Sequence, residues 1–186
     1  QALANQNFTT ATDTFNTAVG FQSGASVTTG TNNTLIGGLA GDALTTGSFN
    51  IAVGSGALGT EDGNGKNVAI GYQALTVLNA GTDAFNVAIG QESGHDLTTG
   101  VQNVLIGGLT GDALTDADEN VAVGISALTS DTKGSRAVAI GAGALFTQNF
   151  TTATNGYNVA VGYHAGHDIT TGVQNVLMGR LAGDAI

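Results

Sequence analysis

Two histidine–aspartate pairs hold the side chains best suited to chemistry in this sequence. The pairs are His95 with Asp96 and His167 with Asp168. Imidazole nitrogens and carboxylate oxygens are common metal ligands, so these pairs, with His164 near the second, are candidates for a metal site. The equivalent position earlier in the chain holds residues 25–26, Ala and Ser. Because an adjacent pair also offers fewer ligands than a stable site needs, we favour turn residues here over a metal site.

Acidic turns offer a second, weaker candidate for ion binding. Oxygen-bearing side chains alternate within residues 62–66 and 116–120, as in part of a calcium loop. Neither segment has the closing bidentate glutamate, so we favour solvated turns, and calcium stays the only cofactor candidate. A third set recurs in the string Gly-Asp-Ala and is predicted to form structural turns. Its members are Asp42, Asp112 and Asp184.

Composition argues against several other functions. The chain has 4 Lys and Arg residues against 14 Asp and Glu, a net charge of −10, and no Cys. So few basic residues cannot form a phosphate-binding surface, and we expect no nucleic-acid partner. No apolar run approaches the roughly 20 residues of a membrane span, so we expect no membrane insertion. No nucleophile, base and oxyanion donor occur together in a suitable motif, and we expect no enzymatic activity.

A repeat of 17 residues determines the organisation of the chain. The string Asn-x-Ala-Ile-Gly and its variants occur ten times, with two spacings lengthened to 19 and 21 residues. The glycines of the repeat are Gly20, Gly37, Gly54, Gly71, Gly90, Gly107, Gly124, Gly141, Gly162 and Gly179. The asparagines four residues earlier are Asn16, Asn33, Asn50, Asn67, Asn86, Asn103, Asn120, Asn158 and Asn175. Ala137 alone interrupts the asparagine series.

The repeats form a higher order of four. Residues 1–186 are predicted to be one repetitive segment, with four-repeat blocks near 16–85 and 86–157 and a partial block at 158–186. The longer spacings place insertions before every fourth asparagine, where they lengthen a loop without disturbing a stack. Because both ends fall inside a block, we expect the segment to belong to a longer fibre.

A repeat of this length with β-branched alternation predicts one coil of a parallel β-solenoid. In Asn-Val-Ala-Ile-Gly at residues 67–71, Val68 and Ile70 share one face and Ala69 lies on the other. Gly-, Asn- and Asp-rich turns close each coil. The fold class is therefore all-β, with about ten coils and the asparagines aligned along the stack. The alternation of side chains along the strand is compatible with either face pointing into the coil, and we place the Val/Ile pair inward.

The other strand face leads us to expect an oligomer. The residue two positions before each repeat glycine is Ala in most copies and Leu in three, namely Leu35, Leu105 and Leu177. With Val and Ile inside, this small apolar stripe would be exposed on a single thin chain. Burial against copies of the same stripe would explain its composition, so we expect a homo-oligomer, most simply a trimer.

Residues 67–75, Asn-Val-Ala-Ile-Gly-Tyr-Gln-Ala-Leu, resemble the head repeats of trimeric autotransporter adhesins and the longer repeats of phage tail-fibre proteins. The resemblance covers essentially the whole chain. It implies a homotrimeric, left-handed parallel β-roll that acts as a stiff stalk or a receptor-binding head. The 17-residue period is longer than that of the adhesin heads, and no neck, coiled-coil stalk or anchor is recognisable.

Three functions are compatible with this pattern. We expect a structural or adhesive fibre segment, in a virion or on a cell surface, that presents or forms a surface for a receptor or glycan. The alternative is an extracellular filament whose copies join end to end through open solenoid edges. A monomeric ice-binding solenoid is a weaker hypothesis, because adjacent threonines such as Thr98 and Thr99 point to opposite strand faces.

Overall fold

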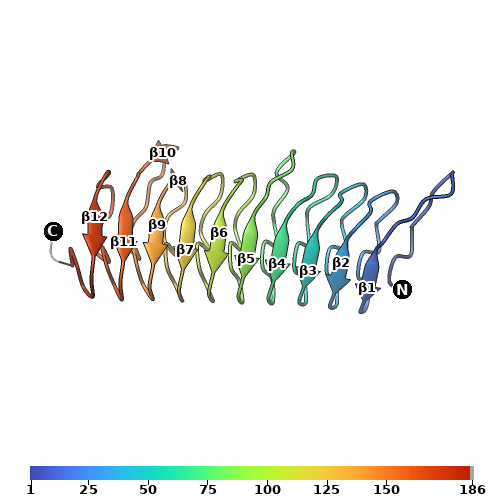
Figure 1. Ribbon diagram of the computed structural model, residues 1–186, viewed down its shortest axis with the longest axis horizontal. Helices are drawn as coiled ribbons and strands as arrows, with labels where there is room; N and C mark the ends of the chain where they lie inside the picture. Colours follow the sequence, from blue (N-terminus) through green and yellow to red (C-terminus); the bar gives the residue numbers. More distant parts are fainter. Residues whose placement is uncertain (185–186) are drawn as a thin grey trace.

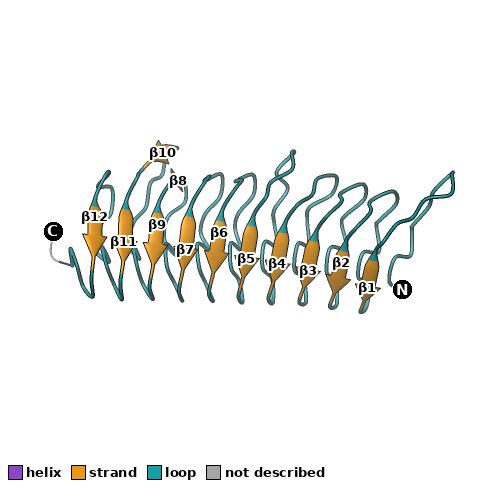
Figure 2. Ribbon diagram, viewed as in Figure 1, coloured by secondary structure: helices purple, strands orange, loops and turns teal. Residues whose placement is uncertain are grey.

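The computed structural model describes residues 1–184, which form a rod of stacked coils with no helix (Figures 1 and 2). Residues 1–184 thus contain no helix of the length and apolarity that a membrane crossing requires. Ten strands form one sheet along the rod: β1 (Thr17–Val19), β2 (Thr34–Ile36), β3 (Ile51–Val53), β4 (Val68–Ile70), β5 (Val87–Ile89), β6 (Val104–Ile106), β7 (Val121–Val123), β9 (Val138–Ile140), β11 (Val159–Val161) and β12 (Val176–Met178). A separate parallel pair, β8 (Gly134–Ser135) and β10 (Thr154–Asn155), lies in the loops.

Each strand of the long sheet pairs in parallel with the strand of the next coil. The register is constant, as in β6 and β7, where Val104 pairs with Val121 and Leu105 with Ala122. The chain thus advances by one rung per repeat, and the predicted parallel solenoid of about ten coils is confirmed. Loops of the two longer repeats extend the coil outline after β4 and near β10 without interrupting the sheet (Figure 1).

The glycine that ends each strand is required by close stacking. Gly37, for example, has φ +136°, and a Cβ built on it would lie 2.5 Å from the carbonyl oxygen of Gly54 in the next coil. Both the backbone conformation and the contact exclude a side chain. The same arrangement recurs from coil to coil, which explains why glycine ends every copy of the repeat.

The asparagines line up along the rod, as predicted, and join neighbouring coils through the backbone. Asn103 donates its backbone N–H to Oδ1 of Asn86 at 2.9 Å, and its own Oδ1 accepts the N–H of Asn120 at 3.0 Å. Its amide nitrogen donates to the carbonyl of Ala117 at 2.8 Å, which closes the coil. The side chain is fully buried, so these bonds satisfy groups that water cannot reach. The dominant contact is therefore amide to backbone, although the amide nitrogen of Asn103 also donates to Oδ1 of Asn86 at 3.2 Å.

The predicted orientation of the strand faces is wrong. The Ala/Leu stripe points into the chain's own core, where Leu35 and Leu105 are fully buried and Leu177 is partly buried. The Val/Ile residues point outward and most are half-buried; Ile36 and Ile51 keep 39% of their surface exposed, and Val19 in the first coil keeps 59%. The stripe of Leu35, Leu105 and Leu177 is therefore core and is not available as an oligomer surface. A single coil already covers this stripe with its own turns.

The core also explains the four-coil block. Leu35 occupies space left by two turn glycines: a Cβ on Gly24 or Gly41 would lie 2.7 or 2.8 Å from its methyl carbons. Leu105 fills the same space beside Gly94 and Gly111. In the other two coils of each block, the residue at the strand centre is small and the residue at the turn position is large. Strand centres Ala52, Ala69, Ala122 and Ala139 accompany the turn leucines Leu58, Leu75, Leu128 and Leu145. Close packing requires this exchange, because interiors leave little empty volume.

Candidate functional site

The outward side of the long sheet forms a continuous aliphatic surface, which we call the outer face. It consists of the first and last residue of each strand: Thr17, Val19, Thr34, Ile36, Ile51, Val53, Val68, Ile70, Val87, Ile89, Val104, Ile106, Val121, Val123, Val138, Ile140, Val159, Val161, Val176 and Met178. None of these side chains is charged, although the chain carries 18 charged residues in all. An uncharged surface that runs the length of a protein is characteristic of an interaction face.

Aromatic side chains border the outer face. Phe15, Phe49 and Phe85 lie just before the asparagine of their coil and are at least half exposed. Tyr72 and Tyr163 follow the strand glycine and are also half exposed. Large exposed aromatics beside an apolar strip add contact area of the kind found at protein interfaces.

Two bordering aromatics pair with cations of the preceding coil. Lys66 lies 5.0 Å from the ring centroid of Phe85, and Arg136 lies 5.8 Å from that of Tyr157. Arg136 also binds both carboxylate oxygens of Glu119, at 3.0 and 3.2 Å. These contacts stabilise the column of residues beside the outer face, although exposed pairs of this kind contribute little free energy.

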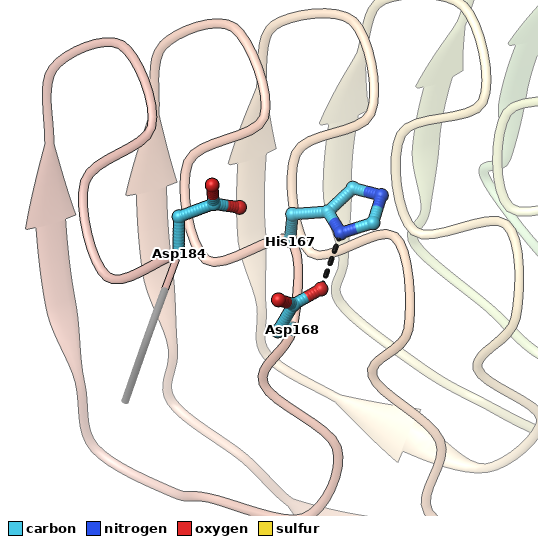
Figure 3. A group of neighbouring side chains, drawn as sticks. All are labelled: His167, Asp168 and Asp184. Carbon is cyan, nitrogen blue, oxygen red and sulfur yellow. Dashed lines mark hydrogen bonds and ion pairs between the residues drawn. The ribbon is translucent and has the colours of Figure 1, made fainter.

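The histidine–aspartate pairs have the same local geometry in both blocks. Nδ1 of His95 lies 2.6 Å from Oδ1 of Asp96, and the distance between His167 and Asp168 is also 2.6 Å. In the partial block at 158–186 the next coil adds Asp184, so that ligand atoms of His167, Asp168 and Asp184 all lie within 4.8 Å of one another (Figure 3). Within the described residues this is the only place where three His, Asp or Glu side chains meet so closely.

A column of stacked aromatic rings holds His167. The ring of His167 is stacked between Phe146, at 5.0 Å between centroids, and His164, at 4.6 Å. Tyr163 continues the stack on His164 at 4.1 Å. These rings line a shallow pocket together with Ile125 and Ala142. Sequence analysis singled out His164 and His167 but missed the stack, because Phe146 meets His167 only when successive coils are superposed.

The other acidic candidates are engaged with neighbouring groups. Oδ1 of Asp118 accepts the backbone N–H of Val101, and Asp116 forms an ion pair with Lys133 at 3.6 Å. Asp112 accepts a hydrogen bond from the hydroxyl of Thr129. Asp42 is half-buried in its turn, and its desolvation raises its pKa. Within residues 62–66, the carboxylate of Asp62 caps the N–H of Gly63. None of these contacts makes a cation cage.

Two buried carboxyls replace aliphatic residues in the core. Glu61 and Asp131 occupy the turn position that holds Leu44 and Leu97 in other coils, and both are fully buried. Desolvation by burial raises the pKa of each, and hydrogen bonds to the carboxyl oppose the rise.

Asp131 belongs to a polar network at the break in the asparagine series. It accepts the N–H groups of Gly134 and Phe150 at 3.0 and 2.9 Å. Gln148 donates to Asp131 and accepts from Asn158, both at 2.7 Å. The network therefore supplies Asn158 with a side-chain partner in the coil that follows Ala137.

The chain was compared with protein-family models, curated proteins and solved structures, and none of them matches it.

Proposed function

We propose that the chain is a structural segment of an extracellular fibre, in which copies of the chain associate side by side through the outer face. The observation that carries this proposal is the uncharged row of outward Val and Ile side chains along all ten coils. At about 4.8 Å per coil, the row extends roughly 45 Å. Removing such a surface from water stabilises association by about 25 cal/mol for each Å² of apolar area buried.

The regular spacing of the outer face favours a second copy of the chain as its partner. A partner that contacts every rung must present groups at the same repeat distance. A parallel copy does so by construction, and a symmetric assembly then repeats each contact along the rod. We propose three copies around a common axis, as the resemblance to trimeric fibre repeats implies. The sides of the rod other than the outer face would stay exposed in this trimer. They would present or form the surface for a receptor or glycan, in a virion or on a cell surface, without an enzymatic role.

The outer face does not favour an ice-binding function. Threonine occurs there only at Thr17 and Thr34, in the first two strands. The remaining strands carry Val, Ile or Met at both positions, so no regular threonine array is formed. This observation supports the fibre proposal over a monomeric solenoid that binds a crystal surface.

Sedimentation equilibrium of the full chain tests the proposal. We expect a mass of three chains for the unmodified protein and a mass of one chain for Val104→Lys/Val121→Lys, because two lysines cannot be buried in an apolar interface. Thr29→Lys/Thr99→Lys adds the same two charges at exposed turns and should leave three chains together. A circular dichroism spectrum identical to that of the unmodified chain would show that the double variant keeps its coils.

Other outcomes are equally decisive. A single-chain mass for the unmodified protein at micromolar concentration would overturn association through the outer face. A mass of two chains would keep the interface and reject the trimer. Long filaments that survive the double lysine substitution would support the alternative of end-to-end assembly.

A further inference from the structure

The coil geometry brings a carboxylate from the next repeat to each histidine–aspartate pair. His167 and Asp184 are five residues after the strand glycines of successive coils, Gly162 and Gly179. In a stack of superposed coils, equivalent positions lie one above the other, so Asp184 is the axial neighbour of His167. The adjacent pair, to which sequence analysis could assign only two ligands, thereby becomes a group of three.

The three side chains lie close to one another. In Figure 3 the carboxylate of Asp184 extends toward His167, whose Nδ1 points to the carboxylate of Asp168 at 2.6 Å. One ligand atom from each lies within 4.8 Å of the other two. An ion at the centre of such a triangle is close to coordination distance from all three, and small side-chain rotations complete the approach. Stacking of the His167 ring on Phe146 and His164 limits its motion and prepares this arrangement.

We propose that His167, Asp168 and Asp184 bind a divalent first-row transition metal such as Zn²⁺. One imidazole nitrogen with two carboxylate oxygens is a ligand set that such ions accept, whereas Ca²⁺ prefers oxygen ligands alone. Three protein ligands leave at least one coordination position for water or for another donor. The ion would join two successive coils. It would replace the hydrogen bond between His167 and Asp168 in one coil by bonds to these two residues and to Asp184 in the next coil.

The preceding block contains the same three residue types at the same coil positions. His95, Asp96 and Asp112 precede His167, Asp168 and Asp184 by 72 residues each. The first pair is already in place, with 2.6 Å between His95 and Asp96. Asp112 instead accepts a hydrogen bond from Thr129, which an ion must displace. We therefore assign a second, weaker site to this block.

Equilibrium dialysis of the full chain against Zn²⁺, followed by metal analysis, tests the proposal. We expect two ions per chain, a loss of the tighter one in His167→Gln and Asp184→Asn, and a loss of the weaker one in His95→Gln. Asp13→Asn is the control, because it removes an exposed carboxylate outside the ligand set and should keep both ions. Binding that is absent from the unmodified chain, or that is unchanged in the combined His95→Gln/His167→Gln variant, would overturn the proposal.

The first block provides a gain-of-site experiment. Ala25, Ser26 and Asp42 occupy the same three coil positions, with only the last ligand present. Ala25→His/Ser26→Asp should therefore raise the stoichiometry by one Zn²⁺ per chain, and adding Asp42→Asn should abolish the increase. An unchanged stoichiometry would contradict the claim that these coil positions define the site. The result is independent of oligomeric state, because every ligand of a site belongs to one chain.

Discussion

The two faces of most strands differ in side-chain size rather than in polarity. In β7, Ala122 points into the core and is fully buried, while Val121 and Val123 point outward and are half-buried. The smaller side chain is inside because each coil encloses a narrow space, part of which is taken by turn residues such as Leu128. The larger side chains are outside, where only a partner could cover them. In a thin solenoid, apolar character alone therefore does not identify the core.

Truncation inside the coil should have the greatest consequence for stability. Leu105→Ala removes a fully buried side chain that fills the space beside two glycines, and we expect a loss of about 2–5 kcal/mol in the free energy of unfolding. Val104→Ala, one residue earlier on the outer face, should cost about 1 kcal/mol or less in the unassociated chain. Urea unfolding at low protein concentration measures both, and equal losses would contradict the assignment of the two faces.

The exchange of large and small residues predicts a specific rescue. Leu105→Ala/Gly111→Leu gives the coil the combination found in the following one, Ala122 with Leu128. Gly111→Leu alone should destabilise the chain, because its Cβ would lie 2.8 Å from a methyl carbon of Leu114 and 2.9 Å from one of Leu105. We expect the double variant to recover part of the lost stability, because it removes the second of these contacts. A double-mutant cycle on the same urea curves measures this coupling. Additive losses would show that the two positions do not share one space.

Interruption of the asparagine row should have a smaller effect. Asn103→Ala leaves the backbone N–H of Asn120 and the carbonyl of Ala117 without their partner inside the coil. We expect a loss of about 1–3 kcal/mol in the same urea experiment, the usual consequence of unsatisfied buried polar groups. Asn79→Ala, at an exposed position with an ordinary backbone conformation, is the control and should change stability little. Equal effects of the two substitutions would contradict the role assigned to the row.

The buried carboxyl Asp131 should give the smallest and most specific effect, a dependence of stability on pH. Its folded-state pKa is raised because burial disfavours the charge, so the folded chain binds the proton more tightly than the unfolded chain. The contribution of this group to stability therefore increases as pH falls from neutral toward its ordinary pKa near 3.8, and it is lost as pH rises through the folded-state value. Melting temperatures between pH 7 and pH 4 measure the effect.

Two variants isolate the contribution of Asp131 from that of the other carboxyls. Asp131→Asn cannot titrate, so the difference in melting temperature between it and the unmodified chain should change across this pH range in favour of the unmodified chain at low pH. Asp13→Asn, at an exposed N-terminal position, should leave the difference constant. A pH profile of Asp131→Asn parallel to that of the unmodified chain would show that the carboxyl is not desolvated.

Local patterns were sufficient to predict the stack. The recurrence of Asn and Gly every 17 residues indicates superposed coils, since the amide of Asn103 and the close contact at Gly37 each require an identical neighbour one coil away. Alternation within residues 67–71 likewise indicates a strand with two distinct faces. Parallel pairing, the number of coils and the alignment of the asparagines followed from these observations.

Which face is inside was decided only by closure of the coil in three dimensions. A period of two residues separates the faces of a strand but does not say on which side the rest of the coil lies. Where the strand centre is large, as at Leu105, the neighbouring turn positions are glycine. This inverse relation of sizes was the one signal in the sequence that could have placed the Ala/Leu stripe inside. The approach of Asp184 to His167 and the link from Asp131 through Gln148 to Asn158 also depend on superposition of coils, because these partners are separated along the chain and meet only when the rod is wound.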